Sequence, residues 1–183
     1  MDQTQIAEAA LLYFILPLWL AAGFADYLCH RASEIEQTSG YRETLLHLLM
    51  FAEIAVPLLA ALFFEINALI ILLMIVGFIM HEATALWDVS FAIDKRQVTP
   101  IEQHVHSFLE MLPLMSIVLV VVLHWPQFLA LFGAGPEAAR FVLSWKRDPL
   151  PWSYVSSFLI AVILLEVMPY AEELVRGLRK ARS

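Results

Sequence analysis

Long apolar segments recur along the chain, and each is about as long as the hydrocarbon of a bilayer is thick. Five such segments cover residues 8–30, 43–63, 66–93, 101–125 and 152–175. At a rise of ~1.5 Å per residue, a helix of any of these lengths crosses ~30 Å of hydrocarbon. Hydrophobic residues fill 61% of the 183 positions and charged residues only 16%. A soluble domain of this size could not bury so much apolar surface. The sequence therefore predicts an all-α integral membrane protein with a single transmembrane domain of five helices.

The connections between the predicted helices are short, with one exception. Only a few residues around Glu65 separate the second helix from the third, which predicts a tight antiparallel hairpin. Thr99 followed by Pro100 is typical of a helix start. The long connection covers residues 126–151, and we expect a short interfacial helix over residues 137–145 within it.

Five crossings place the chain ends on opposite sides, and basic residues are shared unequally between those sides. One side would carry Arg31, Arg42, Lys95, Arg96, Arg176, Arg179, Lys180 and Arg182, and the other Arg140, Lys146 and Arg147. Lys and Arg concentrate on the cytoplasmic side of membrane proteins. We therefore expect a cytoplasmic C-terminus, an N-terminus outside, and a bacterial inner membrane as the location.

Charge and cysteine content exclude several classes of function. The net charge of −7 argues against binding of nucleic acid. Cys29 is the single cysteine, so the chain can form neither an internal disulfide nor a thiolate-rich metal site. Any metal must be held by His and carboxylate side chains.

The first four predicted helices each carry His and carboxylate side chains. The candidate ligands are Asp26, His30, Glu43, His47, Glu53, His81, Asp88, Glu102, His106 and Glu110. Residues four or seven apart share a helix face, as with Asp26 and His30. Even the members of the set that lie farthest along their helices from the cytoplasmic ends fall in the cytoplasmic half of the membrane. Because charged groups in membrane helices normally face one another in the bundle interior, we expect four helices to surround a polar metal-binding core on the cytoplasmic side.

The number and chemistry of these side chains favour two adjacent metal ions. A single tetrahedral ion needs only four ligands, and the surplus suits two divalent ions, with iron as the first candidate and zinc or manganese as the others. Bundle-core di-iron and di-manganese proteins have an analogous design. The His-x-x-x-His boxes of membrane desaturases are absent from the sequence.

Some of these residues also have ordinary structural explanations. Glu102 lies three positions after Thr99 and completes a capping box, and Glu43 lies in the first turn of a helix, where an acid is favoured. Without metal, the set would form a satisfied polar network. Five further residues receive no assigned role: His104, His124, Glu34, Glu82 and Glu166.

The leading hypothesis is a non-haem di-iron oxidoreductase of the hydroxylase or desaturase type, acting on a lipid or another hydrophobic substrate. Ferrous ions with open coordination positions can reduce dioxygen and attack a C–H bond. Glu53 and Glu110 are the expected catalytic carboxylates. Since the chain has no nucleotide or flavin motif, electrons would come from a cytoplasmic ferredoxin or flavin reductase.

Two alternatives remain open from the sequence. A zinc-dependent membrane lipid hydrolase would need one ion to polarise a carbonyl group and Glu53 or Glu110 as the base. A metal-ion or proton transporter or sensor would use the same intramembrane acids and His residues as a path. Polar groups are scarce in the outer half, which favours chemistry over transport.

Overall fold

The computed structural model describes residues 1–182, and every regular element in that range is helical. In chain order these are α1 (Gln3–Ala10), η1 (Leu11–Ile15), α2 (Leu16–Ala32), η2 (Ile35–Gln37), α3 (Tyr41–Phe63), α4 (Ala68–Ile93), α5 (Pro100–Leu123), α6 (Trp125–Ala130), α7 (Trp152–Val162), η3 (Ile163–Val167) and α8 (Met168–Arg182). α1, η1 and α2 join into one long helix, and so do α7, η3 and α8, with π-helical turns at η1 and η3. Together with α3, α4 and α5 they give five long helices, each apolar enough to cross a membrane, as the sequence predicts.

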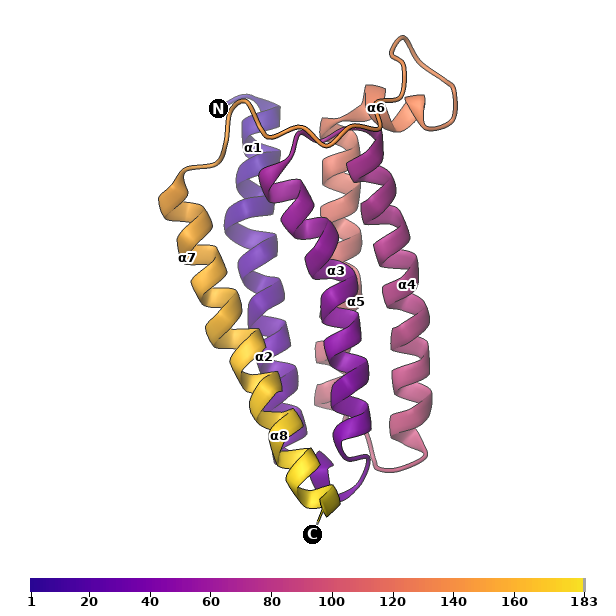
Figure 1. The fold of residues 1–183 in the computed structure, drawn as a ribbon, viewed down its shortest axis with the longest axis vertical. Coiled ribbons are helices and arrows are strands. Elements are labelled where there is room, and N and C mark those ends of the chain that lie inside the picture. Colours follow the sequence, from indigo (N-terminus) through magenta and orange to yellow (C-terminus); the bar gives the residue numbers. More distant parts are fainter. Residues whose placement is uncertain (183) are drawn as a thin grey trace.

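The five long helices lie side by side, with the N-terminus and the C-terminus at opposite ends of the bundle (Figure 1). α3 packs against α4 and α8, and α2 packs against α5. The end that carries the C-terminus, called here the C-terminal end, also holds the connections at residues 33–40 and 94–99. Segments far apart in sequence therefore meet there.

The α3–α4 hairpin has the tight turn that the sequence predicts. Asn67 caps α4, because its side-chain oxygen accepts hydrogen bonds from the backbone N–H groups of Leu69 and Ile70. The start of α5 also follows the expectation, since Thr99 and Glu102 form a capping box.

The expected helix over residues 137–145 is wrong. This stretch is non-helical, and the short helix of the connection is α6 instead. The backbone runs alongside the α3–α4 turn, where the N–H of Glu65 donates to the carbonyl oxygen of Ser144 at 2.8 Å and the N–H of Lys146 donates to that of Phe63 at 3.0 Å. Backbone groups satisfied in this way have no need of helical hydrogen bonds.

The first and the last long helix extend well beyond the predicted apolar segments. The first starts at Gln3 instead of residue 8, because Asp2 and Gln5 form a capping box ahead of the apolar run. The last continues to Arg182 instead of residue 175, and its final turn is rich in basic residues, which the helix dipole favours at that end.

Apolar packing dominates the half of the bundle away from the C-terminal end. One buried cluster joins α4 to α5 and contains Ile66, Ile70, Ile71, Met74 and Val120. A second joins the first, second and fifth long helices through Leu16, Leu20, Leu62 and Phe158. The buried charged residues gather in the other half, which sets the location of the candidate site.

Candidate metal centre

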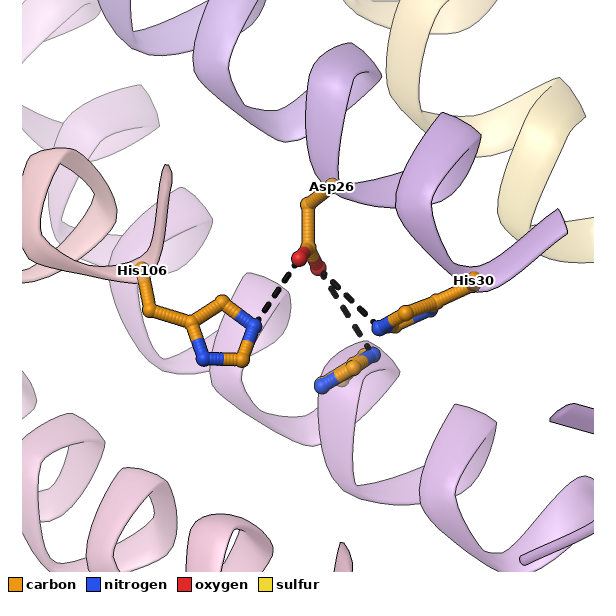
Figure 2. Close-up of side chains that lie close together, drawn as sticks. Asp26, His30 and His106 are labelled. Atoms are coloured by element: carbon orange, nitrogen blue, oxygen red, sulfur yellow. Dashed lines mark ion pairs between the residues drawn. The ribbon is translucent and has the colours of Figure 1, made fainter. Parts of the chain in front are cut away.

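Three helices bring four candidate ligands together near the C-terminal end of the bundle. Asp26 and His30 come from α2 and His106 comes from α5 (Figure 2). His47 comes from α3 and completes the group. One ligand atom from each residue lies within 4.8 Å of the other three. The Asp26 carboxylate lies at the centre, with Oδ1 2.9 Å from Nε2 of His106 and Oδ2 3.5 Å from Nε2 of His30. Asp26, His30 and His47 are each at most 5% exposed, so bulk water has little access to them.

Each of these four residues has one buried polar atom without a hydrogen-bond partner. The atoms are Oδ1 of Asp26, Nε2 of His30, Nδ1 of His47 and Nε2 of His106. Two of these atoms, Oδ1 of Asp26 and Nε2 of His106, lie 2.9 Å apart and form an ion pair when the imidazole is protonated. Because buried polar atoms in proteins are nearly always satisfied, four such atoms in one group are consistent with a site for a metal ion.

Two further carboxylates hold the outer nitrogen atoms of the imidazoles. An oxygen of Glu173, on α8, lies 3.2 Å from Nδ1 of His30. An oxygen of Asp88, on α4, lies 2.9 Å from Nε2 of His47. Because a carboxylate can only accept, a neutral imidazole in either contact carries its proton on the bonded nitrogen. The remaining nitrogen is the atom without a hydrogen-bond partner. Carboxylates commonly orient metal-binding His rings in this way.

Glu43 and Glu102 lie beside the four-residue cluster but bind a cation of the protein itself. Arg96, from the α4–α5 connection, donates from Nε to both oxygens of Glu43 at 3.2 Å and from Nη1 to Glu102 at 3.0 Å. Burial disfavours the charged guanidinium, yet its hydrogen bonds to Glu102 and Glu43 raise the pKa of Arg96 above its ordinary value. The two carboxylates remain 3.9 Å and 3.7 Å from Nε2 of His30, at the edge of the candidate site.

The other predicted ligands lie outside this cluster. Glu53 accepts a hydrogen bond of 2.9 Å from the hydroxyl of Thr84 on the neighbouring helix. Nδ1 of His81 is 3.3 Å from the carbonyl oxygen of Met50. His81 and Glu110 nevertheless line a pocket that also touches Asp26, His47, Asp88 and His106. The structure thus divides the predicted set into a close cluster and residues deeper in the bundle.

The fifth long helix supplies residues that the sequence reasoning missed. Besides Glu173, the hydroxyl of Tyr170 donates to Oδ2 of Asp26 at 3.2 Å. Glu166, left without a role, is 5% exposed and lines the same pocket. The signal was present, because positions 166, 170 and 173 repeat at the spacing of one helix face. The sequence marks Arg96 only as a basic residue of a loop.

The cluster and the charged side chains around it together carry more negative than positive charge. Five carboxylates, those of Asp26, Glu43, Asp88, Glu102 and Glu173, are at most 2% exposed, and Arg96 is the guanidinium among them. Buried charge without compensation costs several kcal/mol per group. Protonated imidazoles or divalent metal ions would supply the missing positive charge.

Comparison of the chain with protein-family models, with curated protein sequences and with solved structures gives no match. The functional argument therefore rests on the geometry of the candidate site.

Proposed function

We propose that this chain is a metal-dependent membrane oxidoreductase that uses non-haem iron to attack a hydrophobic substrate. The observation that carries the proposal is the grouping of Asp26, His30, His47 and His106, in which one ligand atom of each residue lies within 4.8 Å of the other three. Each of these residues also has one buried polar atom without a hydrogen-bond partner. Five helices of membrane-spanning length, with large apolar side chains exposed along their outer faces, support a location in a bilayer.

The donor set limits the choice of metal. Three imidazoles and one carboxylate without sulfur suit iron, manganese or zinc. The carboxylates of Asp88 and Glu173 would raise the basicity of His47 and His30 and hold their rings in place. Bound ferrous iron would supply the electron transfer to dioxygen that side chains lack.

The pocket beside the cluster gives a hydrophobic substrate access to the metal. Its wall combines ligand residues with apolar ones, among them Phe51, Val89 and Leu109. In a hydroxylation, one oxygen atom of dioxygen enters the C–H bond and the other leaves as water, with uptake of two electrons and two protons. Glu110 and Glu166 line the pocket and are the carboxyl groups available to deliver those protons.

The number of ions depends on Arg96. The group of Asp26, His30, His47 and His106 would hold the first ion, and a second would use Glu43, either with His30 and Glu102 or with His47 and Asp88. Arg96 binds Glu43 in both cases, so di-iron loading requires the guanidinium to move away from Glu43.

The electron donor would approach from the C-terminal end of the bundle, which the distribution of Lys and Arg assigns to the cytoplasm. The cluster lies toward that end, so a soluble ferredoxin or flavin reductase would have the shorter path for electron transfer from that side. A donor bound at that end would not cover the apolar half of the bundle, which would stay in contact with lipid.

Zinc-dependent hydrolysis of a lipid is the second candidate. Four ligands around one point match a tetrahedral zinc ion. Glu110 lines the adjoining pocket and would serve as the base that activates water. The identity of the bound metal, zinc or iron, distinguishes the hydrolase from the oxidoreductase.

Metal analysis of untagged, detergent-purified protein tests the proposal. We expect about one to two iron ions per chain in the parent protein, and loss of iron in His30→Ala and His106→Ala. The matched control is His104→Ala, which removes an exposed His from the same helix and should leave the metal content unchanged. Zinc in place of iron would favour the hydrolase, and no metal in the folded parent protein would overturn both candidates.

A further inference from the structure

Two pockets lie one after the other inside the bundle. The first is the pocket beside the candidate metal centre. The second lies between α2, α3, α4 and α5 and is lined by apolar side chains, with Ser116 as the one polar residue in its wall. Trp19 lines both pockets, so the two spaces meet at its side chain.

The lining residues follow a single face on each helix. On α2 they are Leu16, Trp19, Gly23 and Asp26, which are spaced by three or four positions. On α3 the same spacing leads from His47 to Leu58, and on α5 it leads from His106 to Ile117. Three helices therefore line both pockets with consecutive positions of one face, and this face, called here the seam, runs along the bundle axis from the metal centre into the apolar half.

The seam has the length of one leaflet of a bilayer. Eleven positions separate His47 from Leu58, and at ~1.5 Å per residue they span ~16 Å. This is about half of the ~30 Å hydrocarbon thickness of a bilayer, and each leaflet is one acyl chain deep. A chain with one end beside the cluster would have its other end in the second pocket.

Two prolines line the second pocket, Pro57 in α3 and Pro113 in α5, and both lie inside their helices. Proline removes a backbone hydrogen bond inside a helix, so each helix lacks one such bond beside the pocket. Helices in a bundle pack only ~8–10 Å apart, so the seam is narrow as well as long.

We propose that this seam binds a single unbranched hydrocarbon chain, the acyl or alkyl chain of a lipid. The inference deepens the proposed function and rests on it, because it names the substrate whose C–H bonds the metal centre meets. The metal centre contacts the part of the chain in the first pocket, and the second pocket holds the part beyond Trp19. Rigid, branched or polycyclic lipids do not fit a seam of this shape.

Fluorescence of Trp19 reports directly on an occupant of the seam. A protein in which Trp87, Trp125, Trp145 and Trp152 are replaced by Phe retains Trp19 as its one Trp, and all four replaced residues are exposed. This protein is purified in a detergent without a straight alkyl tail and titrated with stearic acid brominated at mid-chain. We expect saturable quenching, whereas a brominated sterol should quench only weakly.

Matched serine variants test whether the chain occupies the second pocket. Ser116→Phe fills that pocket and should weaken the quenching affinity by about tenfold or more. Ser107→Phe is the control, because Ser107 lies on the same helix, makes the same hydrogen bond to the carbonyl four residues earlier, and is exposed. Should Ser116→Phe fail to fold, Ile117→Phe fills the same pocket from the next position.

Equal quenching in the pocket-filled and control variants, or tighter binding of the sterol, would overturn the inference. Metal content is measured on the same samples, which separates the two proposals. If the protein holds iron but does not bind the hydrocarbon chain, the inference is wrong and the proposed function stands. If it binds the hydrocarbon chain but holds no metal, the proposed function is wrong and the binding seam stands.

Discussion

Gly23 on α2 and Glu166 on the π-helical turn η3 face each other so closely that a β-carbon on Gly23 would lie 2.3 Å from Oε2 of Glu166. The other carboxyl oxygen, Oε1, is buried without a hydrogen-bond partner. Both residues line the pocket beside the candidate metal centre. π-Helical turns inside α-helices occur frequently at functional sites, and this one directs an acid toward a position where only glycine leaves room.

The variant Gly23→Ala should therefore lower the free energy of unfolding by about 1 kcal/mol, the low end of the usual cost of overpacking, because the clashing carboxyl group is the end of a flexible side chain that can shift. Glu166→Ala should restore much of that loss in the double variant, because it removes the group that clashes. Thermal unfolding in detergent measures the cycle. Glu166→Gln keeps the size of the side chain and should not rescue, so a full rescue by Gln would contradict the steric explanation.

Removal of Arg96 should destabilise the metal-free protein strongly. Arg96→Gln leaves the fully buried carboxylates of Glu43 and Glu102 without their guanidinium partner, and breaking a buried ion pair typically costs about 3–5 kcal/mol. The control is Lys95→Gln, at the neighbouring exposed position. Added divalent metal should recover part of the loss in Arg96→Gln, because the freed carboxylates then bind the ion. The idea fails if metal stabilises both variants equally.

The carboxylates behind the imidazoles should control metal affinity. Glu173→Gln and Asp88→Asn keep the shape of the side chains but lose the charge that orients His30 and His47, and each should weaken metal binding by about 10–100-fold. Competition with a chelator measures the affinity. Glu172→Gln is the control, because Glu172 lies next to Glu173 and contacts Arg31 and Arg176 instead of an imidazole.

The turn between α3 and α4 should depend on Asn67. Its side chain caps α4 and also donates to the carbonyl oxygen of Val142 in the long connection at 2.7 Å. Asn67→Ala should cost about 1–2 kcal/mol through loss of the cap alone. Asn67→Asp keeps an acceptor for the cap but lacks the donor, so it should fall between the parent and Asn67→Ala in unfolding measurements. Equal stability of the Ala variant and the parent protein would contradict this role.

The sequence predicts the helices well because hydropathy and length decide them. It also brings Asp26, His30, His47 and His106 into consideration together, since their helical spacing and their distance from the ends of their helices are both readable from positions in the chain. Hydropathy does not reveal how a loop side chain folds back, and so Arg96 was missed as the partner of Glu43 and Glu102.

The position of a residue along its helix does not by itself decide whether it joins the cluster, because a hydrogen-bond partner on the neighbouring helix can hold it elsewhere. Glu53 and His81 lie on the expected helices, yet each bonds to a group on the helix packed beside its own. Rotation of one helix against another decides such contacts, and no spacing rule within one segment contains that information. The fold of residues 137–145 was mispredicted for the same reason, because their backbone bonds to a distant turn.

The contact between His30 and Glu173 joins residues 143 positions apart in the chain. While the chain is being synthesised, His30 leaves the ribosome long before Glu173 exists, and the imidazole lacks the carboxylate that fixes its tautomer until the last helix docks. In the proposed metal protein, capture of metal with full affinity would thus be a late step of biogenesis, after translation of the final helix. Truncated translation products that end before Glu173 would be poor competitors for the cell's metal supply.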